Sequence, residues 1–398
     1  MQLDFNRKEF AGSLGDLGTL LPIAFGMVLL NGVDGTAVFT TIGAYYILSG
    51  MYFGITVPVQ PMKVIGAYAI SRSLTPAQIS GAGLLMGIIL CLLSVTGAME
   101  RVQKIVPKSA VRGVQLSTGV ILITKGLGFI TGKTETQYLP SSEKLASFSA
   151  YLDPSTLNLL LGILAIVVIF MLLENKVAPA ALVVIAGGAI VGWLLGLGQN
   201  ISEVSLGFHY PQILPFGMPT TDDFIFALLV LALPQLPMTV GNAVIAQSDL
   251  TKEYFGDELA KRSSPRALGL SMGMANIVVS FLGGMPLCHG AGGLAAHYRF
   301  GSRTAGSNLM IGGIFLIAGI LIGQQAIDIF AVVPISILGA LLCFAGGQLS
   351  MMILDMKERS DLFVVISMLC VAIVSNLAIG FGIGIVFAYL FKHTKLAV

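Results

Sequence analysis

Two short stretches of the chain combine proline with groups that can bind an anion. VPVQPMKV, residues 57–64, contains Pro58 and Lys63, and GGMPLCHGAGG, residues 283–293, contains Pro286. Proline is well tolerated in the first turn of a helix, because its missing N–H would have no partner there in any case. Each stretch therefore predicts the start of a helix, and the unpaired first N–H groups of a helix favour an anion.

The charge of these two stretches suits a doubly negative ion. If both helices begin at the middle of a membrane, each dipole contributes roughly half a positive charge, and Lys63 adds a full one. The alternatives are a lysine that extends to the membrane surface and prolines that only kink a helix, but an ionisable residue within a span is usually functional. We expect the ion to be bound by residues from both stretches. The predicted binding residues are Val59, Gln60, Lys63, Leu287, Cys288, His289 and Gly290.

Polar residues in two other apolar segments extend this candidate site. Asp16, in SLGDLGTLLP, either caps a helix or serves as a proton-coupling carboxylate inside the membrane. Gln235 lies between two prolines in LPQLPMTVGNAV, which predicts a distorted backbone and a side chain facing the ligand. The alternative is that Gln235 only joins helices by hydrogen bonds. Thr19 and Asn242 are predicted to support the site from behind.

Other kinds of chemistry find little support in the sequence. Cys288 and His289 are adjacent, but no second ligand pair has the spacing of a metal site, so neither a metal nor a cofactor is expected. No serine, histidine and aspartate show a convincing nucleophile–base spacing, which argues against an intramembrane enzyme. The formal net charge of +2 is too small to indicate a nucleic-acid partner.

The elements that must position these residues are membrane-spanning helices. Of the 398 residues, 55% are hydrophobic and only 11% are charged, whereas a soluble domain has about 25% charged residues. The sequence predicts an all-α polytopic membrane protein with about fourteen segments. They are expected at 14–31, 36–53, 58–72, 78–97, 108–130, 157–173, 177–198, 224–247, 267–283, 286–300, 307–325, 327–350, 361–377 and 379–392. The third and tenth are too short for the roughly 20 residues of a full span, so we expect half-helices there, each preceded by a short strand.

Basic residues predict the orientation. With the N-terminus in the cytoplasm, most of the 22 lysines and arginines fall in cytoplasmic loops, as the positive-inside rule requires. A multi-pass protein of the plasma or inner membrane with both termini in the cytoplasm is therefore predicted. The basic residues expected outside are Arg72, Lys133 and Lys144, while Lys63 and Lys125 fall within spans.

Two internal similarities indicate repeats. VPKSAVRGVQLSTGVIL begins at Val106 and VPISILGALLCFAGGQL begins at Val333, and Pro58 and Pro286 are separated by nearly the same number of residues. Seven predicted segments separate the members of each pair, so the second copy would be inverted in the membrane. We expect two inverted repeats, 1–198 and 224–398, an arrangement typical of secondary transporters.

Four motifs make a family resemblance visible. They are GDLGTLLP at 15–22, PVQPMK at 58–63, LPQLPMTVGNAVIA at 233–246 and PLCHGAGGLAAHYRFGSR at 286–303. They resemble the molybdate transporter family of plants and microbes, a branch of the sulfate permease superfamily. The resemblance implies a core domain that moves against a gate domain, a site between the two half-helices and no C-terminal soluble domain. The core would comprise 13–97 and 224–325, and the gate, which often holds a homodimer contact, 108–198 and 327–392. Many sulfate permeases carry a carboxylate where this chain has Gln235, which favours Asp16 as the proton-coupling group.

Together these observations predict a secondary active transporter that imports a tetrahedral oxyanion by alternating access, with molybdate as the first choice. Proton symport is expected because an ionised carboxylate such as Asp16 beside a dianion costs energy, so protonation favours binding. The expected partners are molybdate, sulfate or tungstate, protons and the lipid bilayer. Sulfate, with the same shape and charge, is the main alternative substrate. A nucleobase permease of the same fold would be expected to need a carboxylate in place of Lys63.

Overall fold

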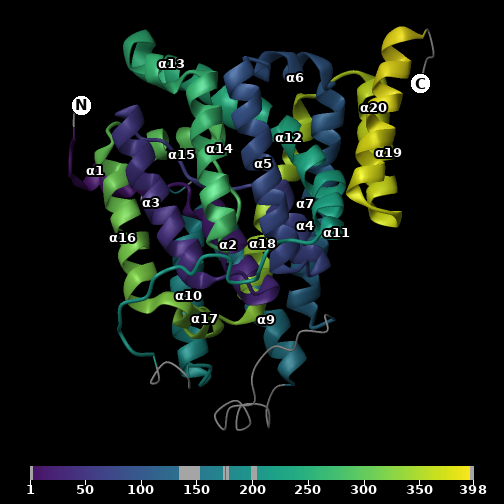
Figure 1. Cartoon of the computed structure of the whole chain (residues 1–398). Helices are drawn as coiled ribbons and strands as arrows, with labels where there is room; N and C mark the ends of the chain where they lie inside the picture. The colour runs from purple at the N-terminus through teal and green to yellow at the C-terminus, as the bar shows by residue number, and fades with distance from the viewer. Residues whose placement is uncertain (1–2, 134–152, 174, 176–178, 199–203, 395–398) are drawn as a thin grey trace.

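The structure is a bundle of helices. The computed structural model describes residues 3–133, 153–173, 175, 179–198 and 204–394, and this part is mostly helical (Figure 1). The first half contains α1 (Arg7–Ser13), α2 (Leu17–Asn31), α3 (Gly35–Phe53), α4 (Lys63–Arg72), α5 (Pro76–Thr96), α6 (Met99–Ile105), α7 (Lys108–Thr131), α9 (Pro154–Leu172) and α10 (Ala180–Leu194). Two short strands, β1 (Gln60–Pro61) and β2 (Leu287–Cys288), are paired.

The second half follows a similar order. It contains α11 (Thr221–Phe226), η2 (Ala227–Ala232), α12 (Leu233–Met238), η3 (Thr239–Ala246), α13 (Gln247–Ala260), η4 (Lys261–Ser263), α14 (Pro265–Phe281), α15 (Ala291–Phe300), α16 (Gly306–Ile322), η5 (Gly323–Gln325), α17 (Ala326–Ala331), α18 (Ile335–Ser350), η6 (Met351–Asp355), α19 (Arg359–Val374) and α20 (Leu377–His393). Among the described residues, six helices are long and apolar enough to cross a membrane, or up to seven if the bent pair α1–α2 is one span. The chain is therefore a multi-pass membrane protein, while the count of fourteen spans stays a prediction.

Every predicted segment contains a helix, but four differ from expectation. The segments predicted at 58–72 and 286–300 become helical only at Lys63 and Ala291, so Pro58 and Pro286 do not lie in the first turn of a helix. The segment predicted at 327–350 was wrong as a continuous span: α17 ends at Ala331 and α18 starts after Pro334, whose backbone is extended. Proline disfavours helical geometry in the residue before it, which explains the break. The segment predicted at 177–198 begins at residues outside the described part, and its helix is α10.

The segment around Gln235 has the distorted backbone that its prolines predicted. It runs as one helix from Thr221 to Ala246, but η2 and η3 within it are π-helical. Pro234 and Pro237 have no N–H to donate, so the regular ladder of hydrogen bonds is interrupted there, and π-turns accommodate the interruption.

Glycines bring the longest helix pairs into close contact. On α7 and α18, a Cβ atom added to Gly119 would lie 2.5 Å from the Gly346 carbonyl oxygen, and one added to Gly346 would lie 2.5 Å from that of Gly119. Gly126 and Gly339 meet in the same reciprocal way. Small residues let helix backbones approach in a membrane, where packing drives association. The two stretches that share VP-x-S in the sequence therefore pack directly on each other.

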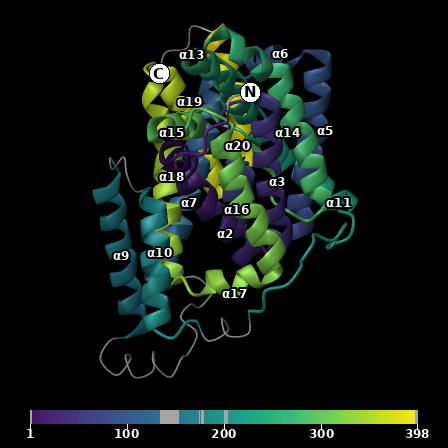
Figure 2. The ribbon, with the colours of Figure 1, turned by 90° about the vertical axis from the view of Figure 1, so that its left-hand side faces the viewer.

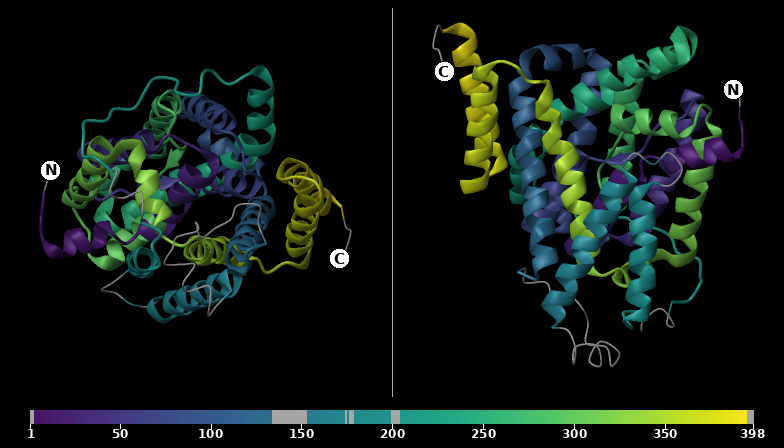
Figure 3. Two further views of the ribbon diagram at one scale, coloured as in Figure 1. Left: turned by 90° about the horizontal axis from the view of Figure 1, so that it is seen from below. Right: turned by 180° about the vertical axis from the view of Figure 1, so that it is seen from behind.

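Two helical hairpins lie at the edge of the bundle. The α19–α20 pair lies toward the upper end in Figure 1, whereas α9 and α10 lie toward the lower end (Figures 1 and 2). The view from behind shows α7 and α18 between these two hairpins (Figure 3). The two ends of the described chain lie near one face of the bundle, together with α6 and α13 (Figure 1).

Candidate functional site

The two proline-containing stretches lie side by side, as predicted. β1 and β2 form an antiparallel ladder in which Gln60 is opposite Cys288 and Pro61 is opposite Leu287. The N–H of Met62 donates to the carbonyl oxygen of Pro286 at 2.9 Å, which extends the ladder by one bond. Segments more than two hundred residues apart in the sequence thus meet in the interior of the bundle.

A short helix follows each strand, and the two helices run in opposite directions. α4 and α15 have 10 residues each, or about 15 Å, which is half of the roughly 30 Å hydrocarbon thickness of a bilayer. In Figure 1, α15 lies toward the upper face and α4 toward the lower. The residues before them, Met62 and Gly290, give no side-chain cap. The N-termini of α4 and α15 therefore both lie next to the β1–β2 ladder inside the bundle. This confirms the predicted pair of short helices preceded by strands.

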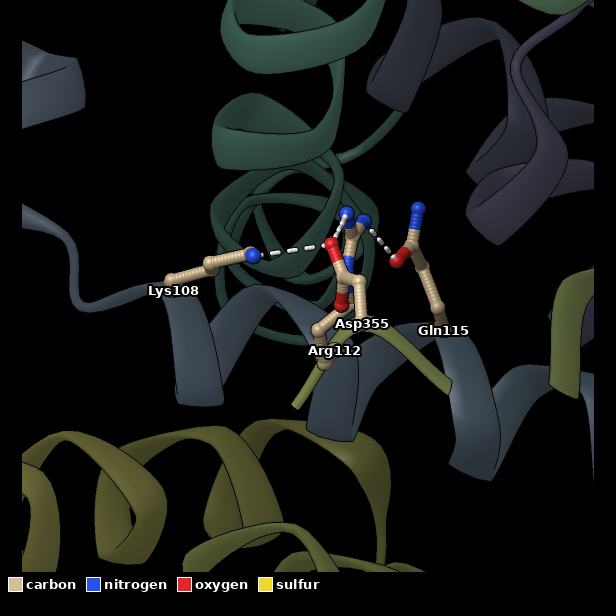
Figure 4. A network of polar contacts seen from close by, with 4 residues as sticks. All are labelled: Lys108, Arg112, Gln115 and Asp355. Atoms are coloured by element: carbon tan, nitrogen blue, oxygen red, sulfur yellow. Dashed lines mark hydrogen bonds and ion pairs between the residues drawn. The ribbon is translucent and has the colours of Figure 1, made fainter. Parts of the chain in front are cut away.

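Lys63 is the first residue of α4 and is half-buried. It takes part in none of the ion pairs between described residues, although the Asp16 carboxylate lies near enough to attract its charge. Lys108 and Arg112, at the start of α7, differ from Lys63, because both form ion pairs with Asp355 (Figure 4). Lys63 is thus an intramembrane cation without a direct carboxylate partner among the described residues.

Asp16 contacts Gln60 of β1, and its side chain does not cap α2. It lies at the break between α1 and α2, which are bent by 45°, and its side chain makes no capping hydrogen bond. Its Oδ1 accepts a hydrogen bond from Gln60 Nε2 at 2.6 Å. Asp16 Oδ2 and Gln60 Oε1 are buried and have no partner among the described residues. Thr19 lies one turn further along α2, and its N–H donates to the Asp16 carbonyl at 3.0 Å.

Gln235 contacts the start of α4, but not in the expected way. Its Oε1 accepts hydrogen bonds from the N–H groups of Val64 at 2.9 Å and Ile65 at 3.3 Å, and its Nε2 donates to Thr239 Oγ1 at 2.9 Å. The side chain therefore acts as a helix cap supplied by a distant segment. Gln235 thus occupies N–H groups of α4 that an anion would use, and its predicted contact with the ligand stays a prediction.

His289 links the two stretches by hydrogen bonds, while its predicted contact with the ion stays a prediction. It is fully buried, with Nδ1 2.9 Å from the Pro58 carbonyl oxygen and Nε2 2.8 Å from the Tyr45 hydroxyl. A carbonyl can only accept, so Nδ1 carries the hydrogen, and Nε2 of the neutral ring accepts from Tyr45. Cys288 is also tied, because its thiol donates to the Pro61 carbonyl at 3.4 Å. Both residues hold the ladder together.

Two asparagines that the sequence analysis missed fix the extended segments. The carboxamide of Asn276 binds both the N–H (2.8 Å) and the C=O (2.7 Å) of Leu287. Asn308 binds the N–H (3.0 Å) and the C=O (2.8 Å) of Val57 in the same manner. Each side chain thereby imitates a neighbouring strand, which non-helical backbone needs inside a membrane. Single asparagines within the apolar runs of α14 and α16 were the available signal.

The start of α15 is lined by glycines. A Cβ atom at Gly293 would lie 2.7 Å from both Asp16 Oδ2 and Gln60 Nε2, and one at Gly290 would collide with Gln60 Oε1 and lie 3.3 Å from Asn242 Nδ2. Gly292 is exposed, with open space where its side chain would be. The backbone of α15 thus approaches the Asp16–Gln60 pair closely and faces open space on its other side.

Of the remaining predicted binding residues, Val59 and Leu287 contribute backbone. Val59 is buried, and its carbonyl accepts from the Tyr46 hydroxyl at 3.2 Å. The predicted binding residues lie at the start of α4, at the start of α15, in the ladder between them or, for Gln235, in contact with the start of α4. The arrangement offers backbone N–H groups and one ammonium to an anion.

Comparison with known proteins shows the family to which the chain belongs. Residues 8–122 and 227–349 match the family described as "Molybdate transporter of MFS superfamily". Molybdate transporter 2 of Arabidopsis thaliana is 34% identical over 98% of this chain and 88% of its own length. Molybdate transporter 1 of Chlamydomonas reinhardtii is 28% identical over 95% of this chain and 90% of its own. These relatives are named as transporters, which supports a non-enzymatic role.

Solved structures of anion transporters share the fold. The transmembrane domain of the cyanobacterial bicarbonate transporter BicA aligns with a TM-score of 0.65 and 15% identity, over 97% of this chain and 98% of that one. Murine Solute Carrier 26 family member A9 aligns with a TM-score of 0.68 and 14% identity, over 98% of this chain and 69% of that one. The fold of this chain is that of these two anion transporters, although the description of the matching family names the MFS superfamily. With matches in both halves and curated relatives over nearly its whole length, the chain belongs to the molybdate transporter family.

Proposed function

We propose that this protein imports a tetrahedral dianion, with molybdate as the substrate. One observation carries the proposal: α4 and α15 begin at the same buried ladder, and Lys63 at the first position of α4 has no ion-pair partner among the described residues. Two helix N-termini and one ammonium give about two positive charges. The names of the relatives supply molybdate as the choice among such dianions.

We propose a binding mode that uses the N-termini of both short helices. The ion would accept hydrogen bonds from the first N–H groups of both helices, with Lys63 supplying charge. Val64 and Ile65 now donate to Gln235, so an ion at α4 would displace or share that side chain. Gly290 and Gly293 would let the α15 backbone approach. His289 and Cys288 would act indirectly, by holding the two starting points together.

We further propose transport by alternating access between two inverted repeats. The support is the close packing of α7 on α18, the equal length of α4 and α15, and the opposite placement of the α9–α10 and α19–α20 hairpins (Figure 1). The core would contain α1–α5 and α11–α16, and the gate α7, α9, α10 and α17–α20, with a homodimer contact through the gate. α6 with Arg101 and Lys104, η4 with Lys261 and Arg262, and the two chain ends would face the cytoplasm, which fits the positive-inside rule.

Uptake into proteoliposomes tests the substrate. Purified protein in vesicles should take up labelled molybdate, and excess unlabelled molybdate or tungstate should compete. Sulfate is the second candidate, because it has the same charge and shape. Sulfate that competes as strongly as molybdate would make the protein a general oxyanion transporter. A complete lack of uptake for all three ions, by vesicles containing folded protein, would reject the proposal.

Proton coupling through Asp16 is part of the proposal. Asp16 is buried beside Gln60 and near Lys63, and an ionised carboxylate near a bound dianion is unfavourable. Acidic buffer outside the vesicles should therefore accelerate uptake by the wild type but not by Asp16→Asn. Uptake that ignores a pH gradient in the wild type would exclude symport while leaving oxyanion transport intact.

A further inference from the structure

His297 is a buried histidine that the proposed transport mechanism does not use. It lies on α15, and its side chain is fully buried. Its Nδ1 lies 2.8 Å from the Thr56 hydroxyl oxygen, and its ring stacks on Tyr46 of α3 with 6.3 Å between the ring centres. Its Nε2 is buried and has no hydrogen-bond partner among the described residues. Buried polar atoms nearly always pair with a protein group or with ordered water, so Nε2 marks a place where a further group binds.

The neighbours of His297 determine which of its two ring nitrogens carries the hydrogen. The Thr56 hydroxyl has a single hydrogen, which it donates to Asn308 Oδ1 at 3.3 Å. Thr56 Oγ1 then accepts from His297 Nδ1, so Nδ1 of the neutral ring carries the hydrogen. Nε2 is left with a free lone pair that can accept a hydrogen bond or a proton.

A second unpartnered acceptor lies on the same face of α15. A Cβ atom added to Gly293 would lie 2.7 Å from Asp16 Oδ2, which is also buried and without a partner in the described part of the chain. Residues four apart on a helix share one face, with about 6 Å between their Cβ atoms, and side chains point toward the helix N-terminus. The neighbouring extended chain agrees, because Pro58 lies beside Gly293 and Thr56 beside His297. The His297 ring therefore points along α15 toward Asp16.

We propose that a buried water connects these two atoms and that His297 receives the proton which Asp16 releases. The inference rests on the proposed proton coupling through Asp16. A water has two hydrogens, so it can donate to Asp16 Oδ2 and His297 Nε2 together and satisfy both atoms. When Asp16 is protonated, its O–H donates to the water, and the water donates to Nε2. The O–H bond of Asp16 and one O–H bond of the water then break, and each hydrogen moves to the next atom. The products are ionised Asp16, water and a His297 ring protonated on both nitrogens.

His297 lies on the cytoplasmic side of Asp16 in the proposed orientation. α15 begins beside the β1–β2 ladder and extends toward the face that also holds the chain ends (Figure 1). His297 is the seventh of its ten residues, about 9 Å along the helix from Ala291. Arg299, two residues later, is exposed. A proton on Nε2 has therefore moved most of the length of α15 toward the cytoplasm.

The other titratable groups around α15 have partners of their own or lie near its far end. α15 packs on α1, α13 and η3, and η3 contains no titratable residue. On α1, Glu9 accepts from backbone N–H groups in the turn after α15, and Lys8 lies beside the end of α15. On α13, Tyr254 stacks on Tyr298, and on α3 the Tyr46 hydroxyl donates to a backbone carbonyl. Asp16 is therefore the carboxylate on the side to which the His297 ring points.

Two substitutions separate a proton carrier from a structural histidine. The amide of His297→Asn takes the place of Nδ1 and can keep the bond to Thr56, whereas the amide of His297→Gln takes the place of Nε2 and can keep the bond to water. Neither amide can take up a proton as imidazole does. In proteoliposomes, both variants should lose the acceleration of molybdate uptake by acidic outside buffer. Both should exchange labelled for unlabelled molybdate at the wild-type rate when the pH is equal on both sides, because exchange needs no release of the proton.

The matched control is His393→Gln, which removes an exposed histidine near the end of α20 and should change neither measurement. A full response to acidic buffer in either His297 variant, in vesicles where the wild type responds, would overturn the relay alone. Loss of exchange together with uptake in both variants would show a structural role and also overturn it. A wild type that ignores the pH gradient would reject the coupling through Asp16 and the relay together.

Nitrogen NMR tests the buried water without requiring transport. In protein that contains isotope-labelled histidine, the signals of His297 are those that disappear in His297→Gln. We expect Nε2 to carry no hydrogen at neutral pH and to show a contact with water hydrogens. A hydrogen on Nε2, or the absence of any contact with water, would overturn the proposal. The expected signals in a protein that transports none of the oxyanions would support the buried water link and reject the proposed function.

Discussion

The two short helices that start at the β1–β2 ladder have equal length but different beginnings. α4 starts with Lys63, and its next two N–H groups already donate to Gln235. α15 starts with Ala291, Gly292 and Gly293, and its first turn contains no charged residue. Behind α15 lies the Asp16–Gln60 pair, which leaves no room for a side chain at Gly293. α4 thus provides positive charge, and α15 provides a backbone that approaches the site closely.

This difference indicates that the two helices contribute in different ways to binding the ion. A dianion requires positive charge, but two lysines facing each other would repel in the empty site. A single lysine with two helix dipoles balances the ion with less repulsion in its absence. Glycine on the other helix lets backbone N–H groups approach the ion closely.

Moving the ammonium from one helix to the other tests the division most strongly. Lys63→Met should reduce kcat/KM for molybdate by tenfold to a hundredfold, since charge-assisted hydrogen bonds contribute about 1.5–3 kcal/mol. Adding Ala291→Lys, at the first position of α15, should recover part of the loss, because the charge returns to the other side of the ion. Initial uptake rates across molybdate concentrations measure both.

The control for the charge transfer is Lys104→Met, on an exposed part of α6. It removes the same charge away from the site and should leave uptake unchanged. Wild-type uptake by the Lys63→Met protein would show that the charge of α4 is not needed and would remove the basis of the comparison.

The close approach of α15 to the Asp16–Gln60 pair is tested by a pair of glycine substitutions. Gly293→Ala places a methyl group 2.7 Å from Asp16 Oδ2, Gln60 Nε2 and Pro58 Cβ. We expect about tenfold slower uptake and a lower melting temperature, because overpacking costs about 1–3 kcal/mol. Gly292→Ala, where open space surrounds the added atom, is the matched control and should retain most of its activity. Equal behaviour of the two variants would contradict the close approach of α15.

The role of Gln235 is decided by the sign of a smaller effect. If its Oε1 competes with the ion for the N–H groups of Val64 and Ile65, Gln235→Ala should tighten molybdate binding severalfold. The same variant should lose about 1 kcal/mol of stability, as expected when a helix cap is removed. Titration calorimetry and thermal unfolding measure the two effects. Weaker binding by Gln235→Ala would instead make Gln235 a ligand in its own right.

The smallest effect is expected where cations already have a partner. Arg112 forms two hydrogen bonds to the Asp355 carboxylate, and Lys108 lies 2.8 Å from it (Figure 4). The Asp355 side chain is 41% exposed, and exposed ion pairs contribute about 0–1 kcal/mol. Asp355→Asn should therefore lower the melting temperature slightly and leave molybdate affinity unchanged. A loss of affinity comparable to that of Lys63→Met would mean that the contrast between paired and unpaired cations is false.

The sequence alone determined the features that depend on neighbouring residues. Apolar runs predicted the helices, because a segment must be apolar over its own length to lie in lipid. Pro58 and Pro286 marked the extended segments that precede the two short helices, because proline lacks an N–H and disfavours helical geometry in the residue before it. Lys63 stood out because a charge within an apolar run is costly wherever the chain folds.

Only the tertiary structure decided which polar groups meet. The bond between Gln235 and Val64 joins residues 171 positions apart, and that between His289 and Pro58 joins residues 231 apart. The sequence identified Gln235 and His289 as polar residues near the site, but it could not give their partners. Their contacts with the ion stay predictions. A side chain forms hydrogen bonds with whatever packing places within about 3 Å of it, and in a bundle of helices that neighbour usually comes from a distant part of the chain.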